Sequence, residues 1–153
     1  MKEEIIKSKF TAIKRNKLST PIQKILKNKL INKSDMILDF GCGRGEDITL
    51  LKNKDYKIYG YDPNWHPNEE SLNKKYDIIL CTYVFCVLPA TIRDEILDKI
   101  KDSLKSNGKA YISVRRDIKS ITKTKKGTTQ YPVYLNLPVA FENSSFCIYE
   151  LRK

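Results

Sequence analysis

The stretch Leu38-Asp39-Phe40-Gly41-Cys42-Gly43-Arg44-Gly45-Glu46-Asp47-Ile48 decides the fold of this chain. It predicts a buried strand over residues 36–40, a glycine-rich turn, and then the start of a helix. Because glycine has no Cβ, the alternating glycines allow backbone N–H groups to lie against a ligand. The N-terminus of the following helix adds unpaired N–H donors and the positive end of the helix dipole. The turn is therefore a candidate binding site.

A carboxylate follows the next predicted strand. That strand covers Lys57 to Tyr61 and ends in Asp62-Pro63-Asn64, with Asp62 lying 21 residues after Gly41. In Rossmann-like folds an acidic residue at the tip of the second strand binds the hydroxyls of an adenosine ribose. The glycine turn and this carboxylate, in this order and at this spacing, predict a nucleoside cofactor.

The spacing of the glycines helps to choose the cofactor. A dinucleotide site uses G-x-G-x-x-G, whereas this turn is Gly41-x-Gly43-x-Gly45 and is followed by Glu46-Asp47. Two carboxylates at the start of the helix would repel a pyrophosphate but are compatible with a cationic ligand. A nicotinamide-dependent dehydrogenase is therefore the least favoured alternative. At this point the sequence resembles the class I S-adenosylmethionine-dependent methyltransferases, whose first motif is an acidic residue followed by G-x-G-x-G.

This resemblance implies a fold, a cofactor and a set of binding residues. The fold is α/β and Rossmann-like, with a mainly parallel sheet and an antiparallel edge at the C-terminus, and the cofactor is S-adenosylmethionine. Asp39 and the turn would hold the methionine end, Asp62 would hold the ribose, and residues 81–83 would line the reaction chamber. The implied cofactor-binding residues are Asp39, Gly41, Cys42, Gly43, Gly45, Asp62, Pro63, Asn64, Cys81, Thr82 and Tyr83. No catalytic residue is identified.

The hydrophobic pattern predicts the remaining elements. One helix is expected with Thr20 as its N-cap, a second after Thr91, and strands over Tyr76–Thr82 and Lys109–Val114. Strands that alternate with helices or loops predict a parallel sheet with right-handed crossovers. Two further strands, near residues 130–135 and 145–151, would form the antiparallel edge.

The connection between Asp62 and Tyr76 is short for this family, which usually places a helix and another strand there. The resemblance therefore implies a fold that is trimmed between its second and fourth strands.

Length and composition predict a single domain over residues 1–153. We divide it into a basic N-terminal helical segment (1–35), a cofactor-binding core (36–116), and a basic loop with edge strands (117–153). No apolar run of 18 residues and no signal peptide are visible, so no membrane contact is expected. The four cysteines form no C-x-x-C pair and His66 is the only histidine, so we expect no metal site and a cytoplasmic location.

The net charge of +11 is distributed unevenly along the chain. Residues 1–35 carry 10 basic and 3 acidic side chains, residues 36–108 carry 10 and 12, and residues 109–153 carry 9 and 3. Basic segments on both sides of a nearly neutral core favour a polyanionic substrate. A solvated basic surface is the alternative.

Five residues are candidates for the substrate side. Trp65 could stack on a base, and Arg115 and Arg116 could contact phosphates. The stretch from Thr11 to Pro21, with the glycine turn and Asp62, is similar to the methyltransferases associated with DNA phosphorothioation. That similarity points to nucleic acid, DNA or RNA, and marks Lys14 and Arg15 as candidates to hold a phosphate or the cofactor carboxylate.

Three functions follow, in order of preference. The first is methyl transfer to a nucleic acid, and the second is methyl transfer to a small molecule. The third is a non-catalytic protein that binds S-adenosylmethionine and nucleic acid. The N-P-P-Y motif of amino-directed DNA methyltransferases is absent, and Cys81 and Cys86 lie in apolar runs that favour buried thiols over nucleophiles. The sequence does not indicate an oligomeric state.

Overall fold

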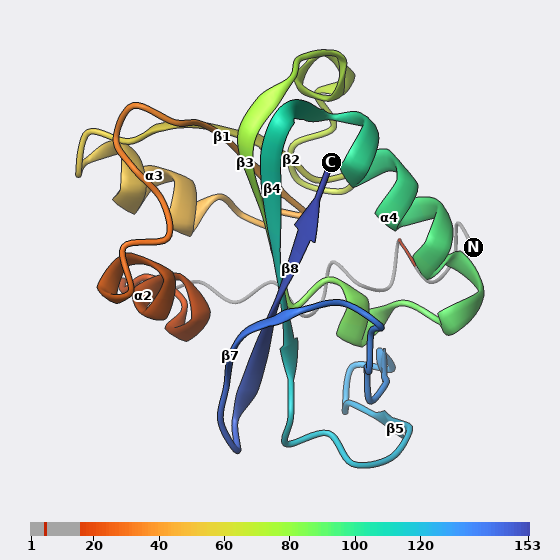
Figure 1. Cartoon of the computed structure of the whole chain (residues 1–153). Helices are drawn as coiled ribbons and strands as arrows, with labels where there is room; N and C mark the ends of the chain where they lie inside the picture. The colour runs from red at the N-terminus through yellow and green to blue at the C-terminus, as the bar shows by residue number, and fades with distance from the viewer. Residues whose placement is uncertain (1–4, 6–15) are drawn as a thin grey trace.

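A single mixed sheet organises the computed structural model, which describes residue 5 and residues 16–153 (Figure 1). Its six strands run in the order β2-β1-β3-β4-β8-β7. The strands β1 to β4 are parallel, whereas β8 is antiparallel to β4 and β7 is antiparallel to β8. The predicted parallel sheet with an antiparallel C-terminal edge is confirmed. The bounds are β1 (Met36–Phe40), β2 (Lys57–Tyr61), β3 (Tyr76–Thr82), β4 (Leu104–Arg115), β7 (Val139–Glu142) and β8 (Phe146–Arg152).

Helices cover both faces of this sheet (Figure 1). On one face lie α2 (Thr20–Lys27) and α3 (Glu46–Lys52), and on the other lies α4 (Arg93–Asp102). The described residues also form three short 3-10 helices and a small hairpin: η2 (Glu69–Asn73), η3 (Phe85–Val87), η4 (Ala90–Ile92), and β5 (Thr122–Lys123) paired with β6 (Thr129–Gln130). The hairpin lies near the carboxyl end of β4 (Figure 1).

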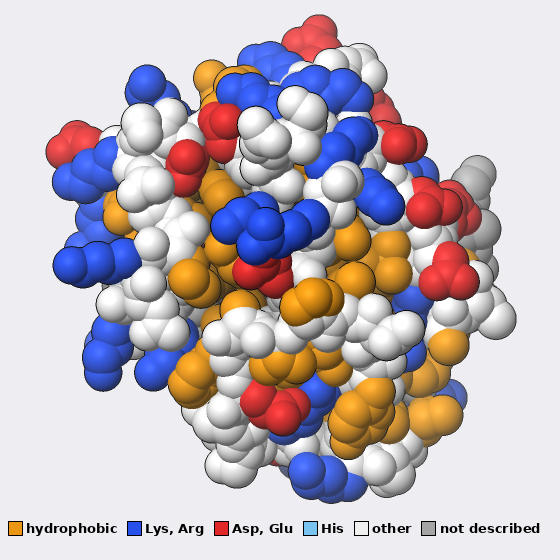
Figure 2. Space-filling view, viewed as in Figure 1, with side chains coloured by type: hydrophobic (Ala, Val, Ile, Leu, Met, Phe, Trp, Pro, Cys, Tyr) orange, Lys and Arg blue, Asp and Glu red, His pale blue; other side chains and the backbone are white. Residues whose placement is uncertain are grey.

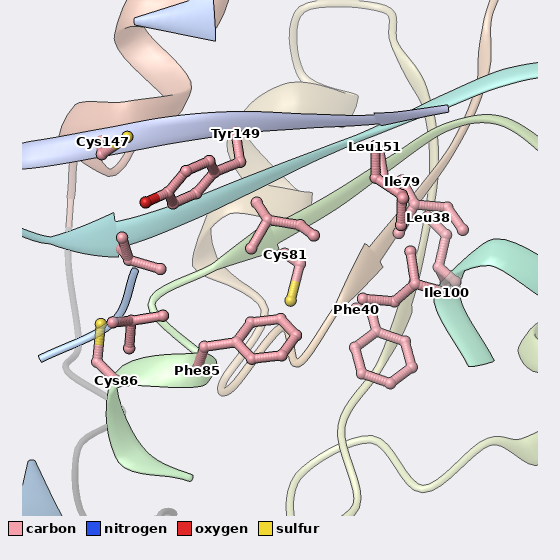
Figure 3. Packing of buried hydrophobic residues seen from close by; sticks show 14 of the residues in the cluster. Leu38, Phe40, Ile79, Cys81, Phe85, Cys86, Ile100, Cys147, Tyr149 and Leu151 are labelled. Carbon is pink, nitrogen blue, oxygen red and sulfur yellow. The ribbon is translucent and has the colours of Figure 1, made fainter. Parts of the chain in front are cut away.

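The alternation of side chains along the strands divides the core into two clusters. Ile78 and Leu80 of β3 pack with Ile22 of α2 on one face. Ile79 and Cys81 pack on the opposite face in a cluster that also contains Ile100 of α4, and Figure 3 shows Phe40, Phe85 and Cys81 of this cluster close together. Because both faces are covered, β3 reads as a continuous apolar run rather than an alternating one.

The connection between β2 and β3 contains no strand of the main sheet in the described part of the chain. Asp62 and His66 exchange two backbone hydrogen bonds of 2.9 and 3.0 Å, so the chain turns back immediately after β2 and then forms η2. As a result β2 is an edge strand of the main sheet. The predicted trimming is confirmed.

Two predicted helix starts are wrong by one or two residues. The N-cap of α2 is Ser19 rather than Thr20, and Thr91 belongs to η4 rather than capping α4. In both places a threonine beside a helix start resembles a cap in sequence, but the neighbouring backbone decides where helical geometry begins.

Two predicted strand positions also need correction. Strand β4 starts at Leu104 rather than Lys109, and Gly108 lies inside it beside a register shift against β3. Of the strand expected near 130–135, only Gln130 lies in a strand, β6 of the small hairpin, and β7 forms the edge of the main sheet instead. Pro132 has no N–H to donate to a ladder, which fits its place outside a strand.

No helix in the described part of the chain is long and apolar enough to cross a membrane.

Candidate cofactor and substrate cleft

The glycine turn forms a tight elbow between β1 and α3. Gly41, Gly43 and Gly45 all have positive φ angles, of 76°, 56° and 83°, which residues with a Cβ rarely adopt. The N–H groups of Gly41 and Cys42 both donate to the carbonyl oxygen of Tyr61, at 2.7 and 3.1 Å. The elbow is therefore fastened to the end of β2.

These bonds correct one expectation about the elbow. The Gly43 N–H donates to Asp62 Oδ2 at 2.9 Å and the Gly45 N–H donates to the Cys42 carbonyl at 3.0 Å. The N–H groups of residues 41, 42, 43 and 45 thus donate within the protein rather than to a ligand. The elbow contributes a surface without Cβ atoms that a ligand can approach closely.

Asp62 faces this elbow, as a nucleoside site requires. Its Oδ1 accepts the N–H groups of Asn64 and Trp65 at 2.9 and 3.1 Å, and its Oδ2 accepts the N–H of Gly43. Each carboxylate oxygen has two acceptor positions, so Oδ2 retains capacity for a ribose hydroxyl. The three N–H donors hold the carboxylate in one orientation.

The elbow and Asp62 open into a cleft of about 1570 Å³. Sites for a single small ligand usually measure about 300–1,000 Å³, so this cleft has room for a cofactor and an acceptor together. Ten of the residues predicted from sequence line it: Asp39, Gly41, Cys42, Gly43, Asp62, Pro63, Trp65, Thr82, Tyr83 and Arg115. Gly45, Asn64, Cys81 and Arg116 are described but do not line it. Lys14 and Arg15 lie outside the described residues.

The comparisons with known proteins agree with this geometry. A family model described as "Methyltransferase domain" matches residues 10–138. The chain belongs to this methyltransferase family. No curated protein matches the chain. Class I methyltransferases use S-adenosylmethionine, which is the cofactor that this family and this fold imply.

Solved methyltransferases share the fold at low sequence identity. The 1,6-didemethyltoxoflavin-N1-methyltransferase of Burkholderia thailandensis, solved with 1,6-didemethyltoxoflavin and S-adenosylhomocysteine, is 14% identical with a TM-score of 0.61, covering 88% of this chain and 77% of its own. The PH0226 protein of Pyrococcus horikoshii is 12% identical with a TM-score of 0.60, covering 86% and 88%.

A S-adenosylmethionine-dependent methyltransferase of Archaeoglobus fulgidus is 20% identical, with a TM-score of 0.52 over 65% of this chain. The methyltransferase described here spans 53% of that protein's length. The predicted class I methyltransferase fold and family are confirmed, whereas the similarity to the methyltransferases associated with DNA phosphorothioation stays a prediction.

The cysteines of this methyltransferase are buried thiols. Burial raises the pKa of Cys42 well above its usual range, and the carboxylates of Asp39 and Asp62 raise it further. Burial also raises the pKa of Cys81, which is fully buried in the α4-side core and does not line the cleft. Cys81 is therefore no longer a candidate for contact with the cofactor. Protonated thiols in such surroundings are poor nucleophiles.

Tyr83 occupies a strained position at the end of β3. Its φ is +60°, and its N–H donates to the Ser113 carbonyl of β4 at 2.9 Å. A tyrosine in the left-handed region costs about 1–2 kcal/mol, and such strain concentrates at functional sites. Tyr83 therefore lines the cleft as predicted, and its left-handed backbone is a feature that the sequence does not reveal.

Arg116 does not face the cleft. Its side chain is 8% exposed and donates to Glu142 Oε2, the Val133 carbonyl and the Tyr149 hydroxyl at 2.7, 2.6 and 2.7 Å. Arg116 therefore fastens the loop before β7 to the sheet, and it leaves the set of phosphate-binding candidates.

Arg115 does line the cleft, where its guanidinium forms an ion pair with Asp117 through two hydrogen bonds.

Trp65 also lines the cleft, and its side chain is 39% exposed. The Arg44 guanidinium lies 4.5 Å from the centre of the Trp65 ring. Asn64 instead donates from Nδ2 to the Ile5 carbonyl at 2.8 Å.

Several cleft residues were missed by the sequence analysis. Ser19 donates its N–H to Asp47 Oδ1 at 2.8 Å, and both residues are buried and line the cleft. Of these two, only Asp47 had a local signal, as part of the acidic pair after the elbow. Lys125 and Lys126 of the hairpin also line the cleft, and they were not missed, because they belong to the basic segment 117–153 that the charge pattern distinguishes. Within the described residues, no three His, Cys, Asp or Glu side chains gather as ligands for a metal.

Replacing Asp62 with asparagine should weaken the binding of S-adenosylhomocysteine by about 10- to 100-fold, because a hydrogen bond to a charged group contributes about 1.5–3 kcal/mol. Isothermal titration calorimetry measures this affinity. Asp77→Asn is the matched control, because Asp77 also accepts a backbone N–H, from Met36 at 2.8 Å, but does not line the cleft. Equal losses in both variants would contradict a ribose contact.

Proposed function

We propose that this methyltransferase transfers the methyl group of S-adenosylmethionine to a nucleic acid. The residues present fit the cofactor: the elbow carries no Cβ at alternate positions and Asp62 presents its carboxylate beside it. When bound, S-adenosylmethionine supplies an activated methyl group on a cationic sulfur. Because the methyl group is already activated, orientation and exclusion of water can supply most of the acceleration.

The charge pattern of the cleft carries this proposal. Carboxylates line the cofactor end, from Asp39, Glu46, Asp47 and Asp62. These negative charges favour a cationic sulfonium ligand. Lys125 and Lys126 from the β5–β6 hairpin also line the cleft, as does Lys17. One cleft thus offers an acidic environment for the cofactor and a basic one for an anionic acceptor.

The lysine hairpin is held in place at its base. The Tyr131 N–H, just after β6, donates to the Cys86 carbonyl of η3 at 2.8 Å, and the Thr124 N–H donates to the Thr128 carbonyl at 2.9 Å. Among the described residues, no carboxylate forms an ion pair with Lys125 or Lys126. Phosphate oxygens of a nucleic acid would supply the missing negative charge.

The shape of the site constrains the form of the nucleic acid. Basic side chains are spread over the face seen in Figure 2 rather than gathered in one patch, so this face does not form a continuous basic track for a duplex. A cleft suits a single base that has left its stack, as in a single strand or a flipped nucleotide. We therefore expect single-stranded DNA or RNA to be preferred over a duplex.

The double variant Lys125→Ala/Lys126→Ala should reduce the salt dependence of binding to a single-stranded oligonucleotide. Two lost phosphate contacts lower the slope of log affinity against log salt by about 1.4. Fluorescence anisotropy at several salt concentrations measures this slope. The control is Lys52→Ala/Lys54→Ala, because both lysines are exposed and neither lines the cleft. The same slope change in both pairs would show non-specific charge attraction only.

Transfer of a tritiated methyl group to single-stranded DNA, duplex DNA, RNA and a small-molecule cell extract tests the proposed reaction. Labelled nucleic acid supports the proposal. Labelled small molecules alone would favour the second candidate, to which the Burkholderia enzyme gives weight because its own substrate is a small molecule. Binding of S-adenosylhomocysteine without transfer to any acceptor would indicate a non-catalytic binding protein.

A further inference from the structure

Tyr134 has the most exposed large hydrophobic side chain among the described residues, at 70%. It lies in the loop between β6 and β7 and does not line the cleft. A single exposed aromatic ring is common on a protein surface, so its exposure alone indicates no function. Tyr134 differs from such a ring in the group that lies behind it.

The guanidinium of Arg116 supports the Tyr134 ring. Its carbon lies 4.6 Å from the centre of the ring, which is the geometry of a cation–π contact. Hydrogen bonds to Glu142, Tyr149 and the Val133 carbonyl fix this guanidinium, and Arg116 is 8% exposed. Because the tyrosine itself is 70% exposed, one face of its ring rests on a fixed cation and the other face is open to solvent.

An aromatic ring held in this way is suited to stacking. Flat π systems prefer to stack with an offset, and every nucleobase presents such a face. A ring that is already oriented loses little conformational freedom when a base stacks on it, so less of the interaction is offset by entropy. The open face of Tyr134 is therefore a pre-organised surface for a flat ligand.

The charge of the surrounding segment indicates the kind of ligand. Residues 118–141 contain four lysines and no acidic residue. Figure 2 shows hydrophobic side chains exposed beside basic ones in the lower half of the view, where Figure 1 shows β5 and β7. Sites for single-stranded nucleic acids combine positive charge for the phosphates with aromatic rings for the bases. This combination favours a nucleic acid over an uncharged apolar partner.

Tyr134 lies within reach of the cleft. It follows Gln130, which lines the cleft, by four residues, so the two Cα atoms are at most about 14 Å apart. Arg116, which supports the ring, directly follows Arg115, which also lines the cleft. About four stacked nucleotides span such a distance at about 3.4 Å each. A strand with one base in the cleft can thus place a nearby base on the ring.

We propose that Tyr134 is a stacking platform for a base that flanks the methylated nucleotide of a single-stranded substrate. The inference rests on the proposed function and adds to it a second binding site outside the cleft. The cleft receives the target base, the lysine hairpin contacts phosphates, and the ring holds a neighbouring base. Because every base has a π face, the platform fixes the position of the strand without selecting its sequence.

The test compares an oligo(dT) strand with an abasic strand of the same length and charge, by fluorescence anisotropy in the presence of S-adenosylhomocysteine. Tyr134→Ala should bind oligo(dT) about 5- to 100-fold more weakly than wild type, which is the usual effect of losing one stacked base. Its affinity for the abasic strand should be unchanged. The slope of log affinity against log salt should also be unchanged, because no phosphate contact is lost. Tyr134→Phe keeps the ring and should bind both strands like wild type.

Tyr59→Ala is the matched control. Tyr59 is also an exposed tyrosine, at 40%, and the ammonium of Lys74 lies 4.4 Å from the centre of its ring. It belongs to the edge strand β2 and does not line the cleft. This variant should bind both strands like wild type, and thermal unfolding verifies that all variants are folded.

Unchanged binding of oligo(dT) by folded Tyr134→Ala, or equal losses on both strands, would overturn the platform while leaving the proposed function intact. A dimer that forms in analytical ultracentrifugation and dissociates in Tyr134→Ala would also overturn it. Ile121 and Val139 are exposed as well, and such a dimer would mark the ring as part of a protein interface. Failure of wild type to bind any single strand would overturn both the platform and the proposed function.

Discussion

Replacing Gly41 with alanine is expected to destabilise the protein by about 3 kcal/mol and to abolish cofactor binding. A Cβ at this position would lie 2.3 Å from Cγ2 of Val84, and the φ of +76° is unfavourable for alanine. The left-handed conformation costs about 1–2 kcal/mol, and overpacking typically costs about 1–3 kcal/mol. Val84 cannot yield easily because β-branched side chains are stiff at χ1. Urea unfolding and calorimetry with S-adenosylhomocysteine measure the two effects.

The variant Gly127→Ala separates the cost of the left-handed backbone from the cost of the contact with Val84. Gly127 has a similar φ of +85°, but nothing lies within 4 Å of the position that a Cβ would take. This variant should lose only about 1 kcal/mol, which is the conformational cost, and should bind the cofactor like wild type. Equal destabilisation of both variants would refute the contact with Val84 as a cause.

Replacing Arg116 with methionine is expected to destabilise the protein by about 3 kcal/mol, because breaking a buried charged network usually costs about 3–5 kcal/mol. Burial alone would lower the pKa of Arg116, but its hydrogen bonds with Glu142 and Tyr149 raise that pKa above its ordinary value. The variant leaves the Val133 carbonyl without its guanidinium donor. The expected loss of stability lies at the lower end of this range because Glu142 is exposed and water can solvate its carboxylate.

The loss of stability of Arg115→Met provides the comparison for Arg116→Met. Arg115→Met removes an ion pair with Asp117 whose side chains are 36% and 53% exposed. Exposed pairs contribute about 0–1 kcal/mol, so this variant should unfold within about 1 kcal/mol of wild type. A loss of stability as large as that of Arg116→Met would mean that burial does not distinguish the two arginines. Urea unfolding of both variants decides between these outcomes.

The central strands could be predicted from the sequence because their signals are local. The strands Met36–Phe40, Lys57–Tyr61 and Tyr76–Thr82 have the predicted bounds, since each is an apolar run that ends at a turn or charged segment. The start of β4 could not be predicted, because Asn107-Gly108 has the local pattern of a helix end. Pairing with β3 overrides that pattern and extends the strand back to Leu104.

The same distinction applies to the site. The glycine elbow and Asp62 are short-range patterns, and the structure brings them together through one hydrogen bond of 2.9 Å. Arg115 and Arg116 are adjacent and identical in type, so the sequence cannot tell which one lies inside. That choice depends on Glu142 and Tyr149, which lie 26 and 33 residues further along the chain. Ser19 and the lysine hairpin likewise reach the cleft only through tertiary packing.

Trp65 is the only tryptophan of the chain, and it stands at the wall of the cleft against the Arg44 guanidinium. Indole emission responds to the polarity and charge of its surroundings. The protein therefore contains a built-in optical probe, and a ligand that stacks on this ring or displaces the guanidinium would change its fluorescence. Occupancy of the cleft can be followed in unlabelled protein, with no background from a second indole.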